Sequence, residues 1–536
     1  MLSRRLALFS TLLTLLILAA VPARAEVRLP SVFGDHMVIQ RDLAAPIWGW
    51  ADPGETVTVT IGGKKKSAAA GPNGRWQVKL DPMAAGGPHE ITVAGSKNSI
   101  TIKDVLVGEV WVCSGQSNMG VRVRSSINSD TEIANANYPR MRLFQIKQDF
   151  SAEPKTDLPA SWQVCSPETV SGFSGVGYFF GRDLHRELDV PVGLIYGCWS
   201  GTWAEAWLSR DGLANPTVKG VIENWWGKIS DSYPGQLKKY NEDLAKWEET
   251  VKQAREKGET PPRKPAPPFD PANSYLTPGF LYNAMIAPVA GYSIRGTIWY
   301  QGEGNIRWGY RYRKIFAALI RDWRRQWGQG DFPFLFVQIA GWRDVPKEPV
   351  ESSFSELREA QLYTWQTVPN TGMAVTLDIG GGVVHFRNKQ EVGRRLALAA
   401  LANTYGRKNL AYSGPVYRSA RREGDKLRLE FDHLGGGLVT SDGGPVQSLA
   451  IAGEDKKFVW AESKIEKDTL VVWSPKVTEP VAVRYGWGEN PPINLFNKAG
   501  LPASPFRTDT WPMNNQREEE AYEKKVAEAA AAPAAK

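Results

Sequence analysis

A serine and a histidine, far apart in the chain, have the types and settings that ester hydrolysis requires. Ser117 follows a stretch of β-branched residues and lies in a small, polar, turn-forming segment. His385 follows a second predicted strand and the glycines at 380–382. Ester hydrolysis at neutral pH needs a nucleophile, a base that takes its proton, and donors for the oxyanion. We therefore predict that Ser117 is the nucleophile and His385 the general base.

The local pattern leaves a structural alternative open for both residues. Met119 stands where the G-x-S-x-G elbow requires its second glycine, and serines in such turns commonly cap helices. The corresponding alternative for His385 is a surface loop. The expected oxyanion donors are the backbone N–H groups of Ser117 and Gly201. A side-chain amide is expected to join them, and the candidates at 301 and 305 are Gln301 and Asn305.

Other chemistries have weaker support in the sequence. A carboxylate pair, Glu303 with Asp378, could in principle support glycoside hydrolysis, but it would leave Ser117 and His385 without a role. No H-E-x-x-H or paired C-x-x-C spacing occurs, and neither does a phosphate-binding or dinucleotide-binding fingerprint. We therefore expect no metal and no cofactor.

Four motifs resemble, in the same order, those of the sialate O-acetylesterase family, a branch of the SGNH hydrolases. They are Gly-Gln-Ser-Asn-Met at 115–119, the segment 191–207 around Gly201, the segment 298–305, and the segment 378–396 around His385. The resemblance covers nearly the whole chain after residue 25. It implies an SGNH-type three-layer α/β/α hydrolase core and the removal of O-acetyl groups from a sugar. Of the two amide candidates, it favours Gln301.

The sequence departs from the family pattern beside the histidine. Members of the family generally carry an aspartate two residues before it, where this chain has Val383. We therefore predict a serine–histidine pair in which a backbone carbonyl of the loop holds the imidazole Nδ1. Glu303 and Asp378 are the possible acid partners. Asp378 is the weaker of the two, because seven residues of loop must fold back for it to meet His385.

Hydrophobic periodicity indicates the elements that position these residues. Strands alternate with helices over 105–411, which predicts an α/β catalytic domain, and period-two strands over 26–104 and 412–512 predict N- and C-terminal β-sandwich domains. A helical insertion at 210–275 begins soon after the Gly201 loop and returns through a proline-rich stretch. It is interpreted as a lid, a substrate wall or a packed insertion. Residues 513–536 form a charged, Ala-rich tail, helical or disordered.

The first 25 residues have the pattern of a signal peptide: arginines, then an apolar run, then an A-x-A site. We therefore expect a periplasmic or secreted protein, with no membrane span after cleavage. The segment carries three arginines and no acid, so its removal lowers the net charge from +8 to +5. This mild, dispersed charge argues against nucleic-acid binding. Three cysteines exclude a disulfide framework. Buried thiols are expected, with a single bridge as the alternative. The oligomeric state is left open.

The substrate is less well determined than the reaction. O-acetylated sialic acid is the substrate that gives the family its name, and acetylated xylan or another polysaccharide is the alternative. A sialate carboxylate would favour an arginine clamp, for which Arg122, Arg124, Arg307 and Arg343 lie near predicted loops. A third hypothesis, a non-catalytic glycan-binding protein with a decayed site, draws on the two β-domains and the 21 tryptophans.

Overall fold

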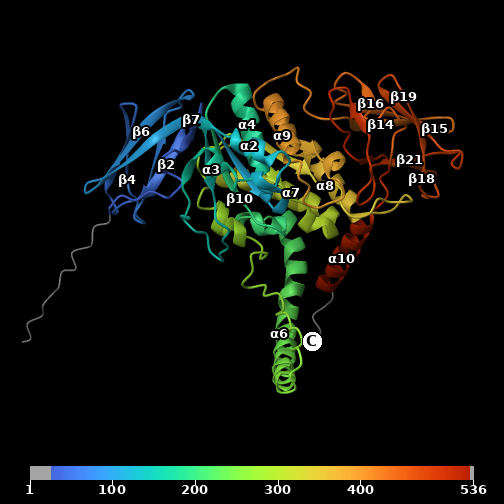
Figure 1. Cartoon of the computed structure of the whole chain (residues 1–536), viewed down its shortest axis with the longest axis horizontal. Coiled ribbons are helices and arrows are strands. Elements are labelled where there is room, and N and C mark those ends of the chain that lie inside the picture. Colours follow the sequence, from blue (N-terminus) through green and yellow to red (C-terminus); the bar gives the residue numbers. More distant parts are fainter. Residues whose placement is uncertain (1–25, 532–536) are drawn as a thin grey trace, which may run out of the picture.

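The computed structural model describes residues 26–531, so the predicted signal peptide lies outside the described part. The N-terminal strands and the C-terminal sheets lie at opposite ends of a central α/β region (Figure 1). One long helix, α6 (Pro216–Glu256), projects away from this region. The chain is thus a mixed α/β protein with a central sheet and additional sheets.

The centre of the molecule is a sheet with the strand order β13-β12-β11-β7-β10-β8-β9, in which every neighbouring pair is parallel except β8–β9. The carboxyl ends of the parallel strands therefore meet at one edge. Because β7 has β10 on one side and β11 on the other, the chain diverges at β7, where such sheets form a crevice. The strands are β7 (Ser99–Gly115), β8 (Tyr138–Gln145), β9 (Trp162–Cys165), β10 (Val192–Cys198), β11 (Gly296–Tyr300), β12 (Phe334–Gln338) and β13 (Thr371–Val375).

Helices cover both faces of this sheet. Successive side chains of a strand point to opposite faces, and those of β7 belong alternately to two apolar clusters: Val110 and Val112 to one, Trp111 and Cys113 to the other. The first cluster includes buried residues of α7 (Gly309–Trp327) and α8 (Ser353–Thr367). The second includes those of α4 (Gly175–Leu188) and α9 (Lys389–Asn403).

Short helical segments connect the strands, and several of them follow the carboxyl ends of the parallel strands. The α-helical ones are α1 (Ser117–Gly120), α2 (Ser129–Ala134), α3 (Pro167–Val170) and α5 (Arg210–Leu213). The 3₁₀ turns are η1 (Val123–Ser125), η2 (Ala204–Trp207), η4 (Glu303–Trp308) and η5 (Leu377–Ile379), and η3 (Tyr282–Ile286) is a π-helical turn.

The N-terminal strands are joined to the central sheet through β7. Its first half pairs with β6 (Gly86–Ala94), and β1 (Val38–Gln40) pairs with Leu106 to Gly108 in its middle. The remaining strands are β3 (Thr56–Ile61) and β4 (Lys64–Ala69), which extend this sheet, and the separate pair β2 (Ala45–Trp50) and β5 (Arg75–Leu80). The predicted domain boundary at 104/105 therefore falls inside a continuous strand.

The C-terminal region consists of two four-stranded sheets and one two-stranded sheet, with the orders β14-β15-β20-β19, β18-β17-β21-β23 and β16-β22. A single apolar cluster, including Leu429, Val472 and Tyr485, lies between them. The strands are β14 (Val416–Glu423), β15 (Lys426–Asp432), β16 (Leu438–Thr440), β17 (Leu449–Ala452), β18 (Val459–Trp460), β19 (Glu462–Glu466), β20 (Thr469–Trp473), β21 (Ala482–Tyr485), β22 (Leu495–Asn497) and β23 (Phe506–Arg507).

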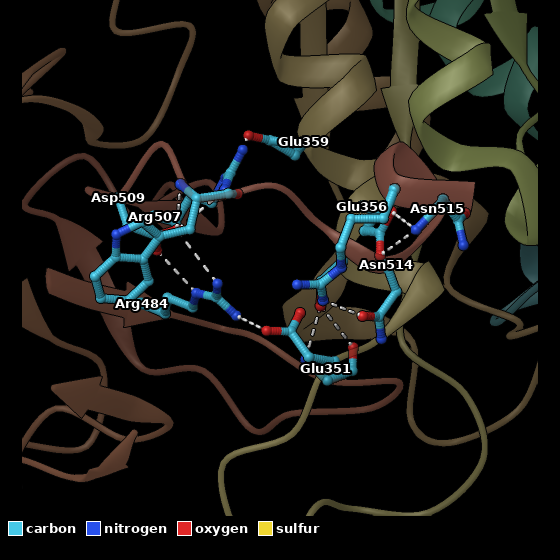
Figure 2. A network of polar contacts seen from close by, with 12 residues as sticks. Glu351, Glu356, Glu359, Arg484, Arg507, Asp509, Asn514 and Asn515 are labelled. Atoms are coloured by element: carbon cyan, nitrogen blue, oxygen red, sulfur yellow. Dashed lines mark hydrogen bonds and ion pairs between the residues drawn. The ribbon is translucent and has the colours of Figure 1, made fainter. Parts of the chain in front are cut away.

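A polar network attaches this region to α8 (Figure 2). Arg484 pairs with Asp509 and with Glu351, and Arg507 pairs with Glu359 of α8. The described part of the tail is a helix, α10 (Asn514–Ala531), and near its start the backbone N–H of Asn515 donates to Glu356 of α8. Residues from the C-terminal sheets and from α10 thus both bind side chains of α8.

Two further findings concern the described residues. Cys113, Cys165 and Cys198 are buried free thiols, which confirms the expectation from their number. Among residues 26–531, no helix has the length and apolar character needed to cross a membrane.

Candidate active site

Ser117 begins helix α1 immediately after the carboxyl end of β7. Gly115 ends the strand with φ +138°, and a Cβ at this position would come within 2.1 Å of the Tyr300 carbonyl oxygen. Only glycine therefore lets β7 end so close to β11. The Gln116 N–H donates to the same carbonyl at 2.9 Å, which fixes the turn on which the half-buried Ser117 lies.

Glu303 holds both neighbours of Ser117. Its carboxylate accepts hydrogen bonds from Gln116 Nε2 at 2.6 Å and from Asn118 Nδ2 at 2.5 Å. The Gly304 N–H donates back to Gln116 Oε1 at 3.2 Å. Burial raises the pKa of the Glu303 carboxyl, against the lowering effect of the Asn118 hydrogen bond and of the Lys389 charge. Glu303 thus ties the serine turn to the segment after β11.

Asn118 also joins the serine turn to the histidine loop. Its Nδ2 donates a second hydrogen bond, of 2.9 Å, to the carbonyl oxygen of Val384. The residue after Ser117 therefore contacts the residue before His385. The structure brings together the two loops that carry these residues, although they are separated by half of the chain.

The His385 side chain is largely exposed. Partial burial and the charge of Lys389 lower its pKa, which favours the neutral, basic imidazole. Within residues 26–531 the ring makes no hydrogen bond, either to Ser117 or to a backbone carbonyl. The expected carbonyl contact of Nδ1 is therefore not formed in this structure. The carbonyl that directly precedes His385 is taken by Asn118.

Neither candidate acid contacts His385. Asp378 forms a two-pronged ion pair with Arg395, with both N–O distances at 2.7 Å, and Arg395 also binds Glu391. Glu303 is engaged by Gln116 and Asn118. In the part of the chain that the structure describes, no carboxylate makes an ion pair or a hydrogen bond with the imidazole. The arrangement is a serine and a histidine without a bound acid.

The loop after β10 supplies the second predicted oxyanion donor. Gly201 is exposed and has φ +72°, and the Trp199 N–H donates to the Gly115 carbonyl at 3.2 Å, which draws this loop to the end of β7. Among the described contacts, the backbone N–H groups of Ser117 and Gly201 donate to no protein acceptor. Both are available to a ligand at this edge.

Gln301 and Asn305 support this loop from the interior. Gln301 Nε2 donates to the Thr202 carbonyl at 3.0 Å and to Asn305 Oδ1 at 2.7 Å, so both of its amide hydrogens are engaged. Asn305 Nδ2 donates to Glu205 at 2.9 Å, and both amides are buried. The structure thus differs from the expectation that Gln301 donates to the oxyanion, because its donors already hold the loop.

Aromatic residues attach the insertion to the same edge. Trp199 stacks on Tyr275, with ring centroids 4.8 Å apart. Further along the loop, a cluster of mostly edge-to-face rings combines side chains from the loop, from α6, from the return segment and from η4: Trp203, Trp225, Trp226, Phe269 and Trp308. Both ends of the insertion are therefore anchored beside Gly201.

Three of the predicted arginines remain available near the serine turn and η4. Arg122, Arg124 and Arg307 are exposed, and none forms an ion pair with a carboxylate of residues 26–531. Arg343, in contrast, pairs with Glu489 at 3.2 Å and lies over the ring of Trp342. Its charge is thus already partly matched.

The sequence interpretation missed Lys389, the first residue of α9. Its side chain is fully buried, and Nζ donates to Asn118 Oδ1 at 2.7 Å. A signal was present, because Lys389 shares the apolar face of its helix with Val392 and Leu396. A lysine on that face, four residues after the proposed base, indicates a buried charge close to the histidine loop.

Comparisons with known proteins show which family the chain resembles over most of its length. The profile of a family described as "Carbohydrate esterase, sialic acid-specific acetylesterase" matches residues 271–402. Sialate O-acetylesterase of Pongo abelii is 30% identical over 527 residues, covering 89% of this chain and 92% of the relative. The Rattus norvegicus protein is 33% identical over 470 residues, covering 78% and 82%. The crystal structure of a carbohydrate acetylesterase from Xanthomonas citri is similar with a TM-score of 0.77 and 36% identity, covering 91% of this chain and 100% of that one.

Proposed function

Because this chain belongs to the sialate O-acetylesterase family, and is therefore a carboxylic-ester hydrolase, we propose that it removes O-acetyl groups from sugars with Ser117 as nucleophile and His385 as general base. The observation that carries the assignment is the pair of hydrogen bonds from Asn118. They join the turn of Ser117 to the loop of His385 and to Glu303.

The proposed reaction follows from the chemistry of these groups. The exposed His385 side chain rotates toward Ser117, and its neutral imidazole takes the hydroxyl proton as Oγ attacks the acetyl carbonyl. The oxyanion accepts hydrogen bonds from the backbone N–H groups of Ser117 and Gly201. As the C–O bond to the sugar breaks, the imidazolium protonates the leaving sugar oxygen, which departs as a hydroxyl. Water, activated by the same imidazole, releases acetate from the acetylated serine.

In this proposal the acids and amides have supporting roles. Glu303 holds Gln116 and Asn118, and Gln301 with Asn305 holds the Gly201 loop. Asp378 stabilises the base of the histidine loop through Arg395. Glu303 and Asp378, the two carboxylates that a glycosidase would use, are thus both bound to other side chains of the protein.

We also propose the finer architecture and the location. The strand order and the helices on both faces support an SGNH-type core, and the C-terminal sheets around an apolar cluster of their own support a flanking β-sandwich domain at that end. For the N-terminal strands, which share one apolar cluster with the central sheet, the sandwich rests on the sequence pattern of residues 26–104. The arginines, apolar run and A-x-A site of residues 1–25 support export to the periplasm or beyond.

For the substrate, we propose an acetylated acidic sugar such as O-acetylated sialic acid. Arg122, Arg124 and Arg307 support this choice, because guanidinium groups without a protein carboxylate favour a ligand carboxylate. A neutral acetylated xylan would make no use of these charges. The glycan-binding alternative predicts affinity without turnover.

The test is acetate release from O-acetylated sialic acid, acetylated xylan and p-nitrophenyl acetate. Ser117→Ala should lower kcat/KM by on the order of 10³-fold or more on every substrate that the protein hydrolyses, because no other group replaces the nucleophile. Ser125→Ala, an exposed serine of the next turn, is the matched control. A folded Ser117→Ala protein that released acetate at the wild-type rate would refute the assignment. Binding of glycans with no turnover of any ester would favour the alternative.

A further inference from the structure

Lys389 is a fully buried cation beside the proposed active site. Within the described residues no carboxylate lies at ion-pair distance from Nζ. Its contacts are Asn118 Oδ1 at 2.7 Å and the rings of Phe386 and Tyr300, whose centroids are 3.6 and 5.3 Å away. Burying an ammonium group without a paired carboxylate is costly, so this position requires an explanation other than packing.

The ammonium group determines which way the Asn118 amide is turned. A carboxamide presents an oxygen on one side and an NH₂ group on the other, whereas a charged lysine can only donate. Lys389 therefore binds the oxygen, and the NH₂ group must face Glu303 and the Val384 carbonyl. In the opposite orientation, the amide oxygen would face two acceptors and the link between the two loops would be lost.

We propose that Lys389 is a positioning residue for the reaction: it fixes the Asn118 amide that joins the Ser117 turn to the His385 loop. This inference rests on the proposed function. It adds a residue that touches neither the nucleophile nor the base.

The charge of Lys389 gives the proposal a pH signature. The groups that face it are Glu303 from η4, Tyr300 from β11 and His385 from its own loop, with Arg358 of α8 acting on Glu303. Burial lowers the pKa of Lys389 to about 7, and Glu303 opposes this shift. The lysine charge lowers the pKa of His385. Without that charge the pKa of His385 rises, so the acid limb of kcat/KM moves to higher pH.

The first test is Lys389→Met, assayed with p-nitrophenyl acetate from pH 5 to 9. We expect kcat to fall by about 10- to 100-fold with little change in KM, and the acid limb to move to higher pH. Arg394→Met is the matched control: it removes one cation from the same helix, at a half-exposed position paired with Glu391. It should change neither kcat nor the pH profile. A folded Lys389→Met protein with wild-type kcat and pH profile would overturn the inference.

A second variant keeps the test decisive if Lys389→Met does not fold. Asn118→Asp has nearly the same size and still accepts from Lys389, but it cannot donate to Glu303 or to Val384. It should lose kcat at least as strongly, and full activity in this variant would equally overturn the inference. The Ser117→Ala variant distinguishes a failure of the proposed function from a failure of the role of Lys389. If that variant keeps its activity, the proposed function fails. If it is inactive while Lys389→Met and Asn118→Asp match wild type, only the role of Lys389 fails.

Discussion

Asp378 and His385 lie seven residues apart, and the structure gives them separate tasks. Because Asp378 is bound to Arg395 through both carboxylate oxygens, Asp378→Asn should leave most of kcat intact while lowering stability by on the order of 3 kcal/mol. His385→Ala should lower kcat/KM by on the order of 10³-fold with little effect on stability, since the ring makes no hydrogen bond within residues 26–531. Initial rates and thermal melts of both variants provide the measurement. Equal losses of activity in the two folded variants would restore a full triad.

The sequence predicted the positions of those site residues that directly follow the end of a strand. Ser117 and Gly201 follow strand ends, and the structure places both at the same edge. The uses of Gln301 and Lys389 could not be predicted in this way. They depend on which partner reaches a given amide or ammonium group, and those partners come from loops that are distant in the chain.

At the scale of elements, the insertion divides into an anchored base and an exposed outer part. Trp225, Trp226 and Phe269 hold the base against the Gly201 loop, whereas most of α6 beyond residue 236 projects from the core (Figure 1). Replacing 237–268 with a short linker should therefore keep kcat/KM for p-nitrophenyl acetate within a few-fold of wild type and alter deacetylation of a polymer more strongly. Trp226→Ala, at the base, should affect both substrates. If the linker variant lost activity equally on both, the insertion would have no role in substrate size.

The elements themselves were largely predictable. Within 105–411, the hydrophobic periodicity of the sequence predicts helices at 311–327, 355–367 and 391–402 and strands at 192–196 and 296–300. The elements α7, α8, α9, β10 and β11 agree with these ranges to within about two residues at each end. The hydrophobic pattern did not reveal strands whose residues are atypical of strands. Pro139 and two arginines obscured β8, and a run of lysines obscured β4. The same periodicity predicts a helix at 281–289, where the structure has the π-helical turn η3.

At the scale of the whole molecule, Glu356 makes the attachment of α10 depend on pH (Figure 2). Burial raises its pKa to about 7, helped by the charges of Glu351 and Glu359 and opposed by the Asn515 N–H. A carboxyl with a raised pKa in the folded state contributes its full stability below its ordinary pKa and loses it as pH rises through about 7. Glu356→Gln cannot ionise and keeps an acceptor for Asn515. Its melting temperature should therefore exceed that of wild type by a margin that grows from about pH 5 to 8.

Glu359→Gln is the control on the same helix. Glu359 pairs with Arg313 and Arg507. Its replacement should therefore lower the free energy of unfolding at pH 7 by on the order of 1–3 kcal/mol, and the melting temperature with it. A melting difference between Glu356→Gln and wild type that stayed constant over this pH range would show that Glu356 does not titrate in the folded protein.

Strand β7 also limits how this protein could be recombined with others. Its first half pairs with β6, and its last half pairs with β10 and β11 before ending at the serine turn. A cut at the apparent junction of residues 104 and 105 would sever the backbone that carries Ser117, and would leave an unpaired edge on either fragment. The N-terminal region can therefore not be exchanged as an independent domain. A chimeric protein or a natural fusion that preserves the central sheet must also keep the N-terminal strands that pair with β7.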